Sequence, residues 1–360
     1  MDFITVIGDN MLDFKKVSKH LEKIRTENGI VGMAVAVTDR NQTLYSEGFG
    51  LCDVDDGCSS VSGRSLFRIA SITKIITGLT ALKMVDAGVL ELDAPITQYL
   101  PWFSFGDSDN TDNITLRRLL SHTAGMPAEY TPDGTRNEAD FLHVLKDEIS
   151  KASPVSDARD CKYLYSNLGI RLAAAAMEAV SGERFSALAR KSVLEPIGMT
   201  NTAFHLRDEA RINLCYPHEK NENGEAKCSH YIAENAARYA AGGLYSNSLD
   251  LSKLARLILM GGAYEGGRII SEESFSEMLA PSAQMSNPRC DEYGLTMMMH
   301  KYKSSVYHGH LGSAPPYATS LFVDRKEGYG VVTLMNSYVP ILRHKIPEMI
   351  FDMIYGDSFL

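Results

Sequence analysis

The chain has 360 residues, of which 44% are hydrophobic and 22% are charged, and its formal net charge at pH 7 is −9. This length allows two lobes or one large unit, and the composition is that of an ordinary folded enzyme. The negative charge and the lack of a Lys/Arg cluster argue against nucleic-acid or membrane partners, and no apolar run approaches the ~20 residues of a membrane span.

The N-terminal residues do not follow the pattern of a secretory signal. Asp2, Asp9 and Asp13 interrupt a short apolar stretch, and the first lysine is Lys15. We therefore expect a cytoplasmic protein, while a secreted form with its signal removed stays open.

Strands are expected near both ends of the chain. Residues 12–27 predict an amphipathic helix, because apolar side chains recur on one stripe. Residues 30–37 and 43–49 predict a hairpin with turn chemistry at Asp39-Arg40-Asn41. A second strand pair is expected at residues 319–323 and 330–334, and a last helix at residues 347–355.

Helical patterns dominate the middle of the chain, at residues 71–87, 168–180, 185–194 and 249–260. The arrangement predicts an α+β fold, in which both termini complete an antiparallel sheet flanked by the N- and C-terminal helices, with a helical lobe inserted. We expect residues 1–66 and 290–360 to form the sheet-containing lobe and residues 67–289 the mainly helical lobe. The active site should lie in the cleft between them.

The six cysteines are Cys52, Cys58, Cys161, Cys215, Cys228 and Cys290. We interpret them as reduced thiols, because a chain of this size does not need disulfides. Cys215, His218, Cys228 and His230 are zinc-type ligands around an expected hairpin turn at Asn223-Gly224. Their spacing matches no common zinc pattern, so we predict no metal and no cofactor, and a zinc-stabilised protein remains an alternative.

Ser71-Ile-Thr-Lys74 opens a predicted helix and is the first candidate for catalysis. A serine nucleophile needs a neighbouring base and a place for developing negative charge. The helix N-terminus supplies N–H groups, and Lys74 lies one turn later on the same face. The alternative is a purely structural role, in which Ser71 caps the helix and Lys74 is a solvated charge, because Ser-x-x-Lys occurs by chance on the order of once in such a chain.

Two further segments carry candidate residues. In Tyr165-Ser-Asn167, a neighbouring ammonium would favour the phenolate, so Tyr165 could act as general base while Asn167 contacts Lys74 and a substrate amide. In Gly309-His-Leu-Gly312, Gly312 would let a substrate approach the strand edge, and His310 would face the pocket as a proton-sensitive donor. Taken singly, each segment favours a structural interpretation: a buried aromatic with an Asn cap for the first and a loop histidine for the second.

Taken in order, these segments resemble the serine β-lactamase and penicillin-binding protein superfamily, especially its class C-like branch of D-aminopeptidases, D-alanyl-D-alanine carboxypeptidases and esterases. The resemblance covers almost the whole chain. It is carried by Phe67-Arg-Ile-Ala-Ser-Ile-Thr-Lys74, Leu119-Leu-Ser-His-Thr-Ala-Gly-Met-Pro127, Tyr165-Ser-Asn167, Glu195-Pro-Ile-Gly-Met-Thr-Asn-Thr202 and Ala241-Gly-Gly-Leu-Tyr-Ser-Asn-Ser248.

The resemblance implies a role for each matching residue. Ser71 would be the nucleophile, Lys74 its proton partner and Tyr165 the base for both acylation and deacylation. Asn167 would bind the substrate amide, and the backbone N–H groups of Ser71 and Ser313 would form the oxyanion hole. His122 would be structural, holding the loop ahead of Gly125.

One departure from the family bears on the substrate. β-Lactamases usually carry Lys-Thr-Gly where this chain has His310-Leu-Gly312, which removes a permanent cation useful for gripping a carboxylate. Pro316 also stands where many relatives have glycine. We therefore expect poor β-lactamase activity, and kcat/KM for carboxylate substrates should fall as pH rises through the His310 pKa.

The sequence thus predicts a serine hydrolase that forms an acyl-Ser71 intermediate on small esters, amides or D-aminoacyl peptides. A β-lactamase of weak or broad activity and a non-catalytic ligand-binding protein of the same fold are the alternatives. The expected partner is a small-molecule substrate, and the oligomeric state stays open.

Overall fold

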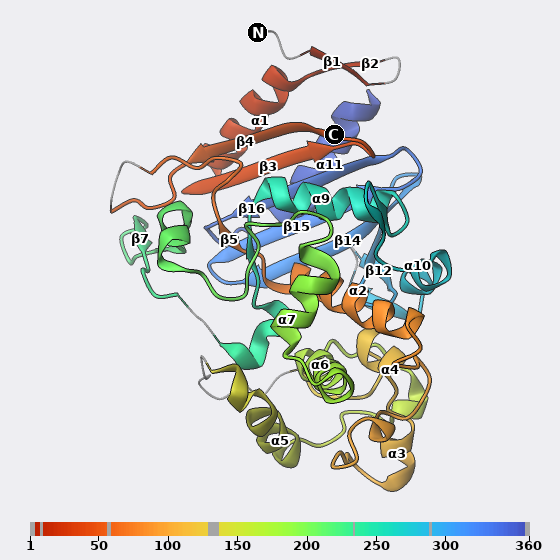
Figure 1. The fold of residues 1–360 in the computed structure, drawn as a ribbon. Coiled ribbons are helices and arrows are strands. Elements are labelled where there is room, and N and C mark those ends of the chain that lie inside the picture. The colour runs from red at the N-terminus through yellow and green to blue at the C-terminus, as the bar shows by residue number, and fades with distance from the viewer. Residues whose placement is uncertain are drawn as a thin grey trace.

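The computed structural model describes residues 4–7, 10–55, 59–128, 137–232, 235–287 and 290–356. Its main element is an eight-stranded antiparallel sheet in the order β11-β12-β13-β14-β15-β16-β3-β4. The strands are β3 (Gly32–Thr38), β4 (Thr43–Gly50), β11 (Ala283–Asn287), β12 (Cys290–Tyr293), β13 (Met298–Tyr302), β14 (Ser305–Ala314), β15 (Tyr317–Asp324) and β16 (Tyr329–Met335). Strands from both parts of the chain meet where β16 pairs with β3, which confirms the predicted fold class (Figure 1).

Helices cover both faces of this sheet. Side chains alternate along β3, so Met33, Val35 and Val37 pack in one core and Ala34 and Ala36 in another. The first core contains residues of α1 (Phe14–Glu27) and α11 (Leu342–Tyr355), and the second contains residues of α9 (Ser248–Leu259). In Figure 1, α9 crosses the face opposite α1 and α11.

The rest of the second core is helical and lies below the sheet in Figure 1. The remaining helices of the chain are α2 (Thr73–Asp86), α3 (Ser108–Asp112), α4 (Leu116–Leu120), α5 (Phe141–Lys151), α6 (Asn167–Ser181), α7 (Phe185–Ala189), α8 (Tyr239–Gly242) and α10 (Glu272–Leu279), and all of them except α3 contribute side chains to this core. Short pairs complete the fold: β1 (Ile4–Ile7) with β2 (Asn10–Asp13), β5 (Phe67–Arg68) with β8 (Tyr245–Ser246), β6 (His218–Lys220) with β7 (Ala226–Cys228), and β9 (Ala263–Tyr264) with β10 (Gly267–Arg268).

Three predicted helices differ from the structure at their ends. The first begins at Phe14 rather than residue 12, because Asp13 belongs to β2 and caps the helix through the Lys15 N–H. Residues 185–194 divide into α7 and a π-helical turn at Arg190–Leu194. The last helix begins at Leu342 instead of residue 347, and its Pro347 lies inside the helix, because apolar side chains before the proline also pack on the sheet.

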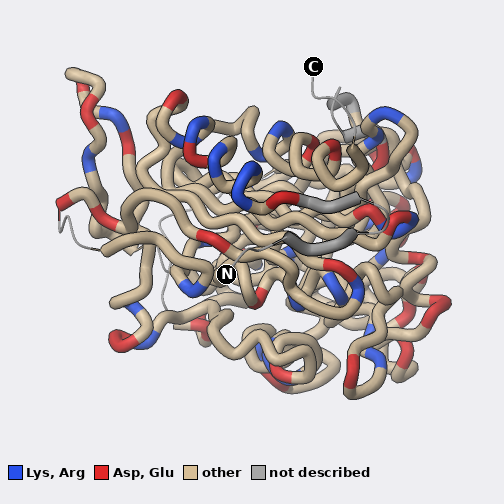
Figure 2. The backbone as a smooth tube through the Cα atoms, turned by 90° about the horizontal axis from the view of Figure 1, so that it is seen from above, with Lys and Arg blue, Asp and Glu red and all other residues tan. Residues whose placement is uncertain are grey.

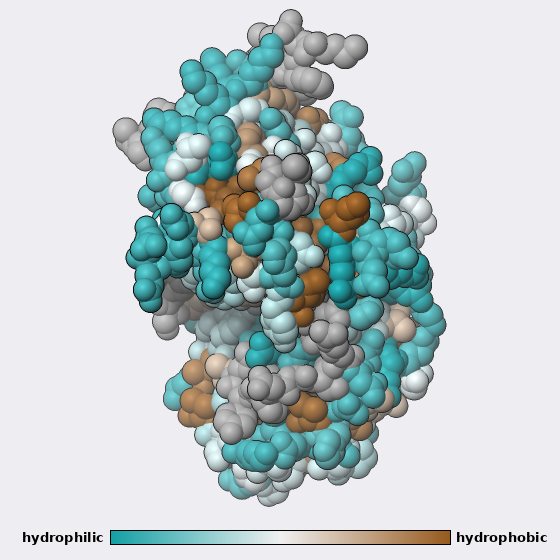
Figure 3. Space-filling model, turned by 90° about the vertical axis from the view of Figure 1, so that its left-hand side faces the viewer, coloured by the Kyte–Doolittle hydropathy of each residue, from teal (hydrophilic) through white to brown (hydrophobic). Residues whose placement is uncertain are grey.

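No helix within the described ranges combines the length and the apolar character that a membrane span needs. Acidic and basic residues alternate along the backbone in Figure 2 without forming one large single-sign region. The face shown in Figure 3 is largely hydrophilic, and its apolar residues form small separate groups. The charge distribution agrees with the absence of a basic cluster in the sequence.

Candidate active site

Ser71 lies where a strand turns sharply into a helix. β5 is followed by a 3-10 turn (Ala70–Ile72) that runs directly into α2. Ala70 has a φ of +48°, a left-handed conformation that is costly for a residue with a side chain. The turn leaves Ser71 partly exposed, while Lys74, one turn further along, is fully buried.

The ammonium of Lys74 links the nucleophile to two other segments. Its Nζ donates to Ser71 Oγ at 3.1 Å, to Asn167 Oδ1 at 2.7 Å and to the Ala241 carbonyl at 2.6 Å. These three acceptors match the three N–H donors of an ammonium group. Lys74 is therefore held in place as a cation beside the serine hydroxyl.

Tyr165 contacts the same hydroxyl. Its phenol oxygen lies 2.8 Å from Ser71 Oγ, and Lys74 Nζ lies 4.8 Å from the centre of its ring. The ring packs against His122, with ring centres 4.3 Å apart. His122 is buried and accepts a hydrogen bond from the Ser166 N–H through Nδ1, which agrees with a structural role.

The start of α6 positions Asn167. Ser166 is the capping residue, since its Oγ accepts from the Gly169 N–H. The Asn167 side chain is thus not needed as a cap, and its backbone N–H donates to the Ala128 carbonyl. The amide oxygen of Asn167 accepts from Lys74, which places this predicted substrate-binding residue beside the three predicted catalytic residues.

A cavity of about 250 Å³ opens over Ser71. It is lined by Arg68, Ala70, Ser71, Asn167, Arg238, Ala241, Gly242, Ser313, Ala314 and Pro315. The pairing of β13 with β14 ends at Met298 and Gly309, while β14 pairs with β15 as far as Ala314. The last residues of β14 therefore present an edge at the cavity that β13 does not cover.

His310 does not have the predicted role of a pocket-facing, proton-sensitive donor. Its side chain is fully buried, Nε2 lies 3.0 Å from the Tyr293 hydroxyl and Nδ1 lies 2.6 Å from the Leu311 carbonyl. Burial, and then the positive charge of Lys74, lower the pKa of His310 to about 3. His310 is therefore neutral throughout the physiological range and cannot switch the binding of a carboxylate there.

Gly312 also differs from its predicted role, because the chain itself fills the space beside it. A Cβ at this position would lie 1.9 Å from Thr319 Oγ1 and 2.3 Å from the Ile69 carbonyl. Thr319 in turn donates to that carbonyl at 3.0 Å. The missing side chain lets β14 pack against the segment that carries Ser71, and a substrate backbone would not occupy this space.

Arg68 and Arg238 border the cavity and were not selected from the sequence. Among the described residues, no acidic side chain lines this cavity, so its charged lining is entirely cationic. Arg68 lies three positions before Ser71 in the same motif, which is a signal that could have identified it. Arg238 ends a 3-10 helix (Ala236–Arg238) and lies three positions before the Ala241–Ser248 motif, which is a comparable signal in the sequence.

The four residues of the alternative zinc site do not form one cluster. The predicted hairpin exists, with His218 opposite Cys228 and a turn at Gly224. Cys215 Sγ instead lies 2.8 Å from the buried thiol of Cys52. Cys58 and the side chain of Cys290 lie outside the described residues, and Cys161, Cys215 and Cys228 are free thiols.

Comparison with known proteins gives consistent matches. A family model described as Beta-lactamase matches residues 17–347. Beta-lactamase-like protein 2 of Dictyostelium discoideum is 26% identical over 285 residues, which cover 76% of this chain and 50% of that protein. D-alanyl-D-alanine-carboxypeptidase/endopeptidase AmpH of Escherichia coli is 26% identical over 252 residues, which cover 69% of this chain and 63% of that protein. The chain thus spans less than two thirds of either relative.

A solved structure shows the same fold. D-amino acid amidase from Ochrobactrum anthropi, complexed with L-phenylalanine amide, has a TM-score of 0.78 and 21% identity, with 96% of this chain and 98% of that chain covered. The family match extends over nearly the whole chain and includes every element that surrounds Ser71. The chain therefore belongs to the Beta-lactamase family, whose fold its structural neighbours share.

Proposed function

We propose that this protein is a serine hydrolase that forms a covalent acyl ester on Ser71. The observation that carries the proposal is the position of Ser71 Oγ, within hydrogen-bonding distance of both Tyr165 OH and Lys74 Nζ. A serine becomes a nucleophile when an adjacent group takes its proton and a cation stabilises the resulting charges. The alternative of a non-catalytic ligand-binding protein is less well supported, because such a protein would not need Lys74 and Tyr165 beside Ser71.

The proposed reaction has two acyl-transfer steps. Tyr165 as phenolate takes the Ser71 proton while Oγ attacks the substrate carbonyl, and the bond to the leaving group breaks as that group receives the proton. In the second step Tyr165 takes a proton from a water molecule as the water oxygen attacks the ester carbonyl. The bond between the acyl carbon and Ser71 Oγ then breaks, and Tyr165 gives the proton to Oγ. Lys74 remains an ammonium and stabilises the phenolate, and the Ser71 and Ser313 N–H groups are the proposed oxyanion hole.

We propose small esters, amides and D-aminoacyl peptides as substrates. AmpH is named as a D-alanyl-D-alanine carboxypeptidase and the Ochrobactrum protein as a D-amino acid amidase, which supports this class. The cavity of about 250 Å³ suits a small acyl group. The guanidinium groups of Arg68 and Arg238 favour a substrate with a carboxylate.

Labelling with a fluorophosphonate probe tests the nucleophile. We expect one label per chain, on Ser71, and the label should disappear in Ser71→Ala together with esterase activity. Ser313→Ala is the matched control, because it removes the other serine hydroxyl that lines the cavity and should keep the label. A label mapped to another residue, or full activity in Ser71→Ala, would refute the mechanism.

The cytoplasmic location expected from the N-terminal sequence remains a prediction. Fractionation of cells that express the protein, followed by immunodetection, tests it directly.

A further inference from the structure

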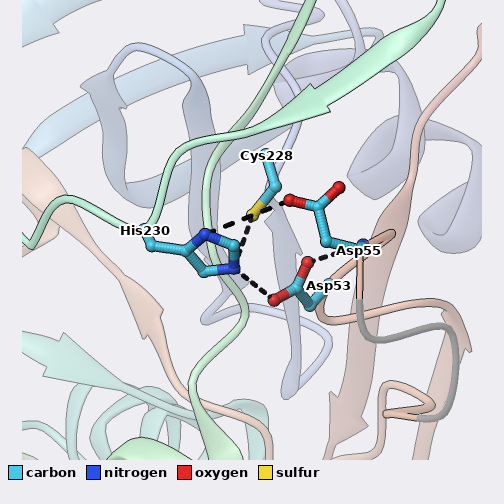
Figure 4. A group of neighbouring side chains, drawn as sticks. All are labelled: Asp53, Asp55, Cys228 and His230. Carbon is cyan, nitrogen blue, oxygen red and sulfur yellow. Dashed lines mark hydrogen bonds and ion pairs between the residues drawn. The ribbon is translucent and has the colours of Figure 1, made fainter.

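A second cluster of reactive side chains lies outside the active site. Asp53 and Asp55 come from the segment after β4, and Cys228 and His230 come from β7 and the residues that follow it. One ligand atom from each of the four lies within 4.8 Å of the others. Figure 4 shows the four side chains converging, with the imidazole ring of His230 facing the thiol and the two carboxylates.

The distance between the sulfur and nitrogen atoms of this cluster matches the edge of a tetrahedral zinc site. Cys228 Sγ lies 3.6 Å from His230 Nε2, and that nitrogen lies 2.6 Å from Asp53 Oδ2. Zinc binds sulfur at about 2.3 Å and nitrogen at about 2.0–2.1 Å, which places tetrahedral S and N ligands about 3.6 Å apart. The Cys–His edge already has this length, and the Asp53 carboxylate needs only a small retreat from the ring.

The charges of the cluster also favour a cation. Asp53 and Cys228 are buried, and the nearby carboxylate of Asp55 is exposed, with Oδ2 4.0 Å from His230 Nδ1. The two carboxylates place negative charge at one point, and a bound metal would displace the proton of the Cys228 thiol, which adds a further negative charge. A divalent metal would balance it, and sulfur and nitrogen donors are the ligands that zinc prefers over magnesium or calcium.

We propose that Asp53, Asp55, Cys228 and His230 bind a structural zinc ion. Four protein ligands fill a tetrahedral shell, and this is the arrangement of structural sites, whereas catalytic sites keep one position for water. The ion would join the segment after β4 to the β6–β7 hairpin. This assignment replaces the expectation of no metal and changes the ligand set suggested by the sequence, since Cys215 and His218 are not ligands.

The β6–β7 hairpin lies close to the active site, so an ion that holds the hairpin in place would also affect the surroundings of that site. His218 accepts a hydrogen bond from the Val54 N–H through Nε2, so the two joined segments are already in contact. Residues of the hairpin line a cavity of about 650 Å³ together with Pro315, which also borders the cavity over Ser71. Zinc would therefore hold one wall of the larger cavity in place.

Metal analysis of the full-length chain tests the proposal. Protein purified without chelator, or reconstituted with Zn²⁺, should hold one zinc per chain, and Co²⁺ in its place should give a sulfur-to-cobalt charge-transfer band. Cys228→Ser and His230→Gln should weaken Zn²⁺ binding by more than about a hundredfold, because loss of an outer-shell partner alone costs about 10–100-fold. Cys161→Ser and His143→Gln, which change an exposed cysteine and an exposed histidine elsewhere, should bind like the wild type.

Two results would overturn the proposal: no zinc bound at micromolar Zn²⁺, or binding that Cys228→Ser leaves unchanged. If Cys228→Ser does not fold, Asp55→Asn serves instead, because its side chain is exposed and its loss should weaken binding without unfolding the chain. The Ser71→Ala variant should bind Zn²⁺ normally. The metal site and the proposed hydrolase activity can therefore fail independently.

Discussion

The two side chains that contact Ser71 Oγ have different chemical capacities. Lys74 is fully buried, and its ammonium group donates to three acceptors. An ammonium group has no lone pair, so it cannot accept the proton of Ser71. The phenol oxygen of Tyr165 lies 2.8 Å from Ser71 Oγ, and a phenolate at this position could accept the serine proton. This difference favours Tyr165 as the base and Lys74 as the cation that stabilises its phenolate.

Replacing Tyr165 by phenylalanine tests that division of roles. The ring that packs on His122 remains, so we expect normal folding and substrate binding, with kcat lowered about a hundredfold or more. Steady-state kinetics on a p-nitrophenyl ester, together with a thermal melt, give both quantities. Lys74→Ala should be at least as damaging, and wild-type kcat in Tyr165→Phe with an inactive Lys74→Ala would make Lys74 the base.

Arg68 provides a test of substrate charge. Arg68→Gln should lower kcat/KM for a carboxylate-bearing substrate about tenfold to a hundredfold, because a hydrogen bond to a charged group contributes about 1.5–3 kcal/mol. A neutral ester should be affected little. The measurement compares both substrates in the wild type, in Arg68→Gln and in Arg64→Gln, an exposed arginine nearby. Equal losses for both substrates would mean that Arg68 does not recognise the carboxylate.

The contact between α5 and α6 contains an ion pair that has no exposure to solvent. Arg171 of α6 bonds Glu148 of α5, and both side chains are 0% exposed. Removing one partner of such a pair leaves an uncompensated charge in the core, which is costly, whereas replacing both by apolar residues is often neutral or stabilising. The pair therefore fixes how the two helices meet, and it makes each residue depend on the other.

Glu148→Leu should lower the free energy of unfolding by about 3–5 kcal/mol, because the Arg171 charge is then buried without a partner. The double variant Glu148→Leu/Arg171→Met should regain most of this loss. Denaturant unfolding followed by circular dichroism measures both. Asp147→Asn is the control on the same helix, since its ion pair with Lys151 is exposed and should contribute less than about 1 kcal/mol. An equally small effect of Glu148→Leu would contradict the prediction.

Buried histidines connect the stability of the whole fold to pH. Burial, with a contribution from Lys74, lowers the pKa of His310 to about 3, and burial lowers the pKa of His308 to about 4. Burial also lowers the pKa of His122, next to Lys74 and His310, well below its usual value. In the unfolded chain these residues take up protons near pH 6.5, but in the folded chain they do so only at much lower pH.

Because the folded-state pKa values are depressed, the stability due to these histidines is fully present above about pH 6.5 and is lost as pH falls toward about 4. Each should contribute up to about 1.4 kcal/mol per pH unit in this window. Urea unfolding at a series of pH values should show this slope, and His308→Gln should reduce it. Constant stability between about pH 4.5 and about pH 7 would contradict the prediction.

The sequence alone predicted most of the helices and strands. The helix at α6 and the strands β3, β4, β15 and β16 follow from apolar periodicity and capping residues, which depend on neighbours a few positions away. The grouping of Ser71, Lys74, Tyr165 and Asn167 was predicted from motifs in a fixed order, and the structure brings these residues together. The α+β architecture followed from strands at both ends with helices between them.

Other properties depend on segments that meet only in the folded chain. The burial of His310 results from Tyr293, and the space beside Gly312 is occupied by Ile69 and Thr319, so neither could be predicted from the Gly309-His-Leu-Gly312 segment. Arg238 reaches the cavity from a short 3-10 helix. The carboxylates that complete the proposed zinc site precede Cys228 by more than 170 residues, as the separation of 177 between Asp53 and His230 illustrates. How deeply a side chain is buried, and which residues can bind one metal ion, depend on which distant segments of the chain come into contact. Tertiary packing therefore decides both properties.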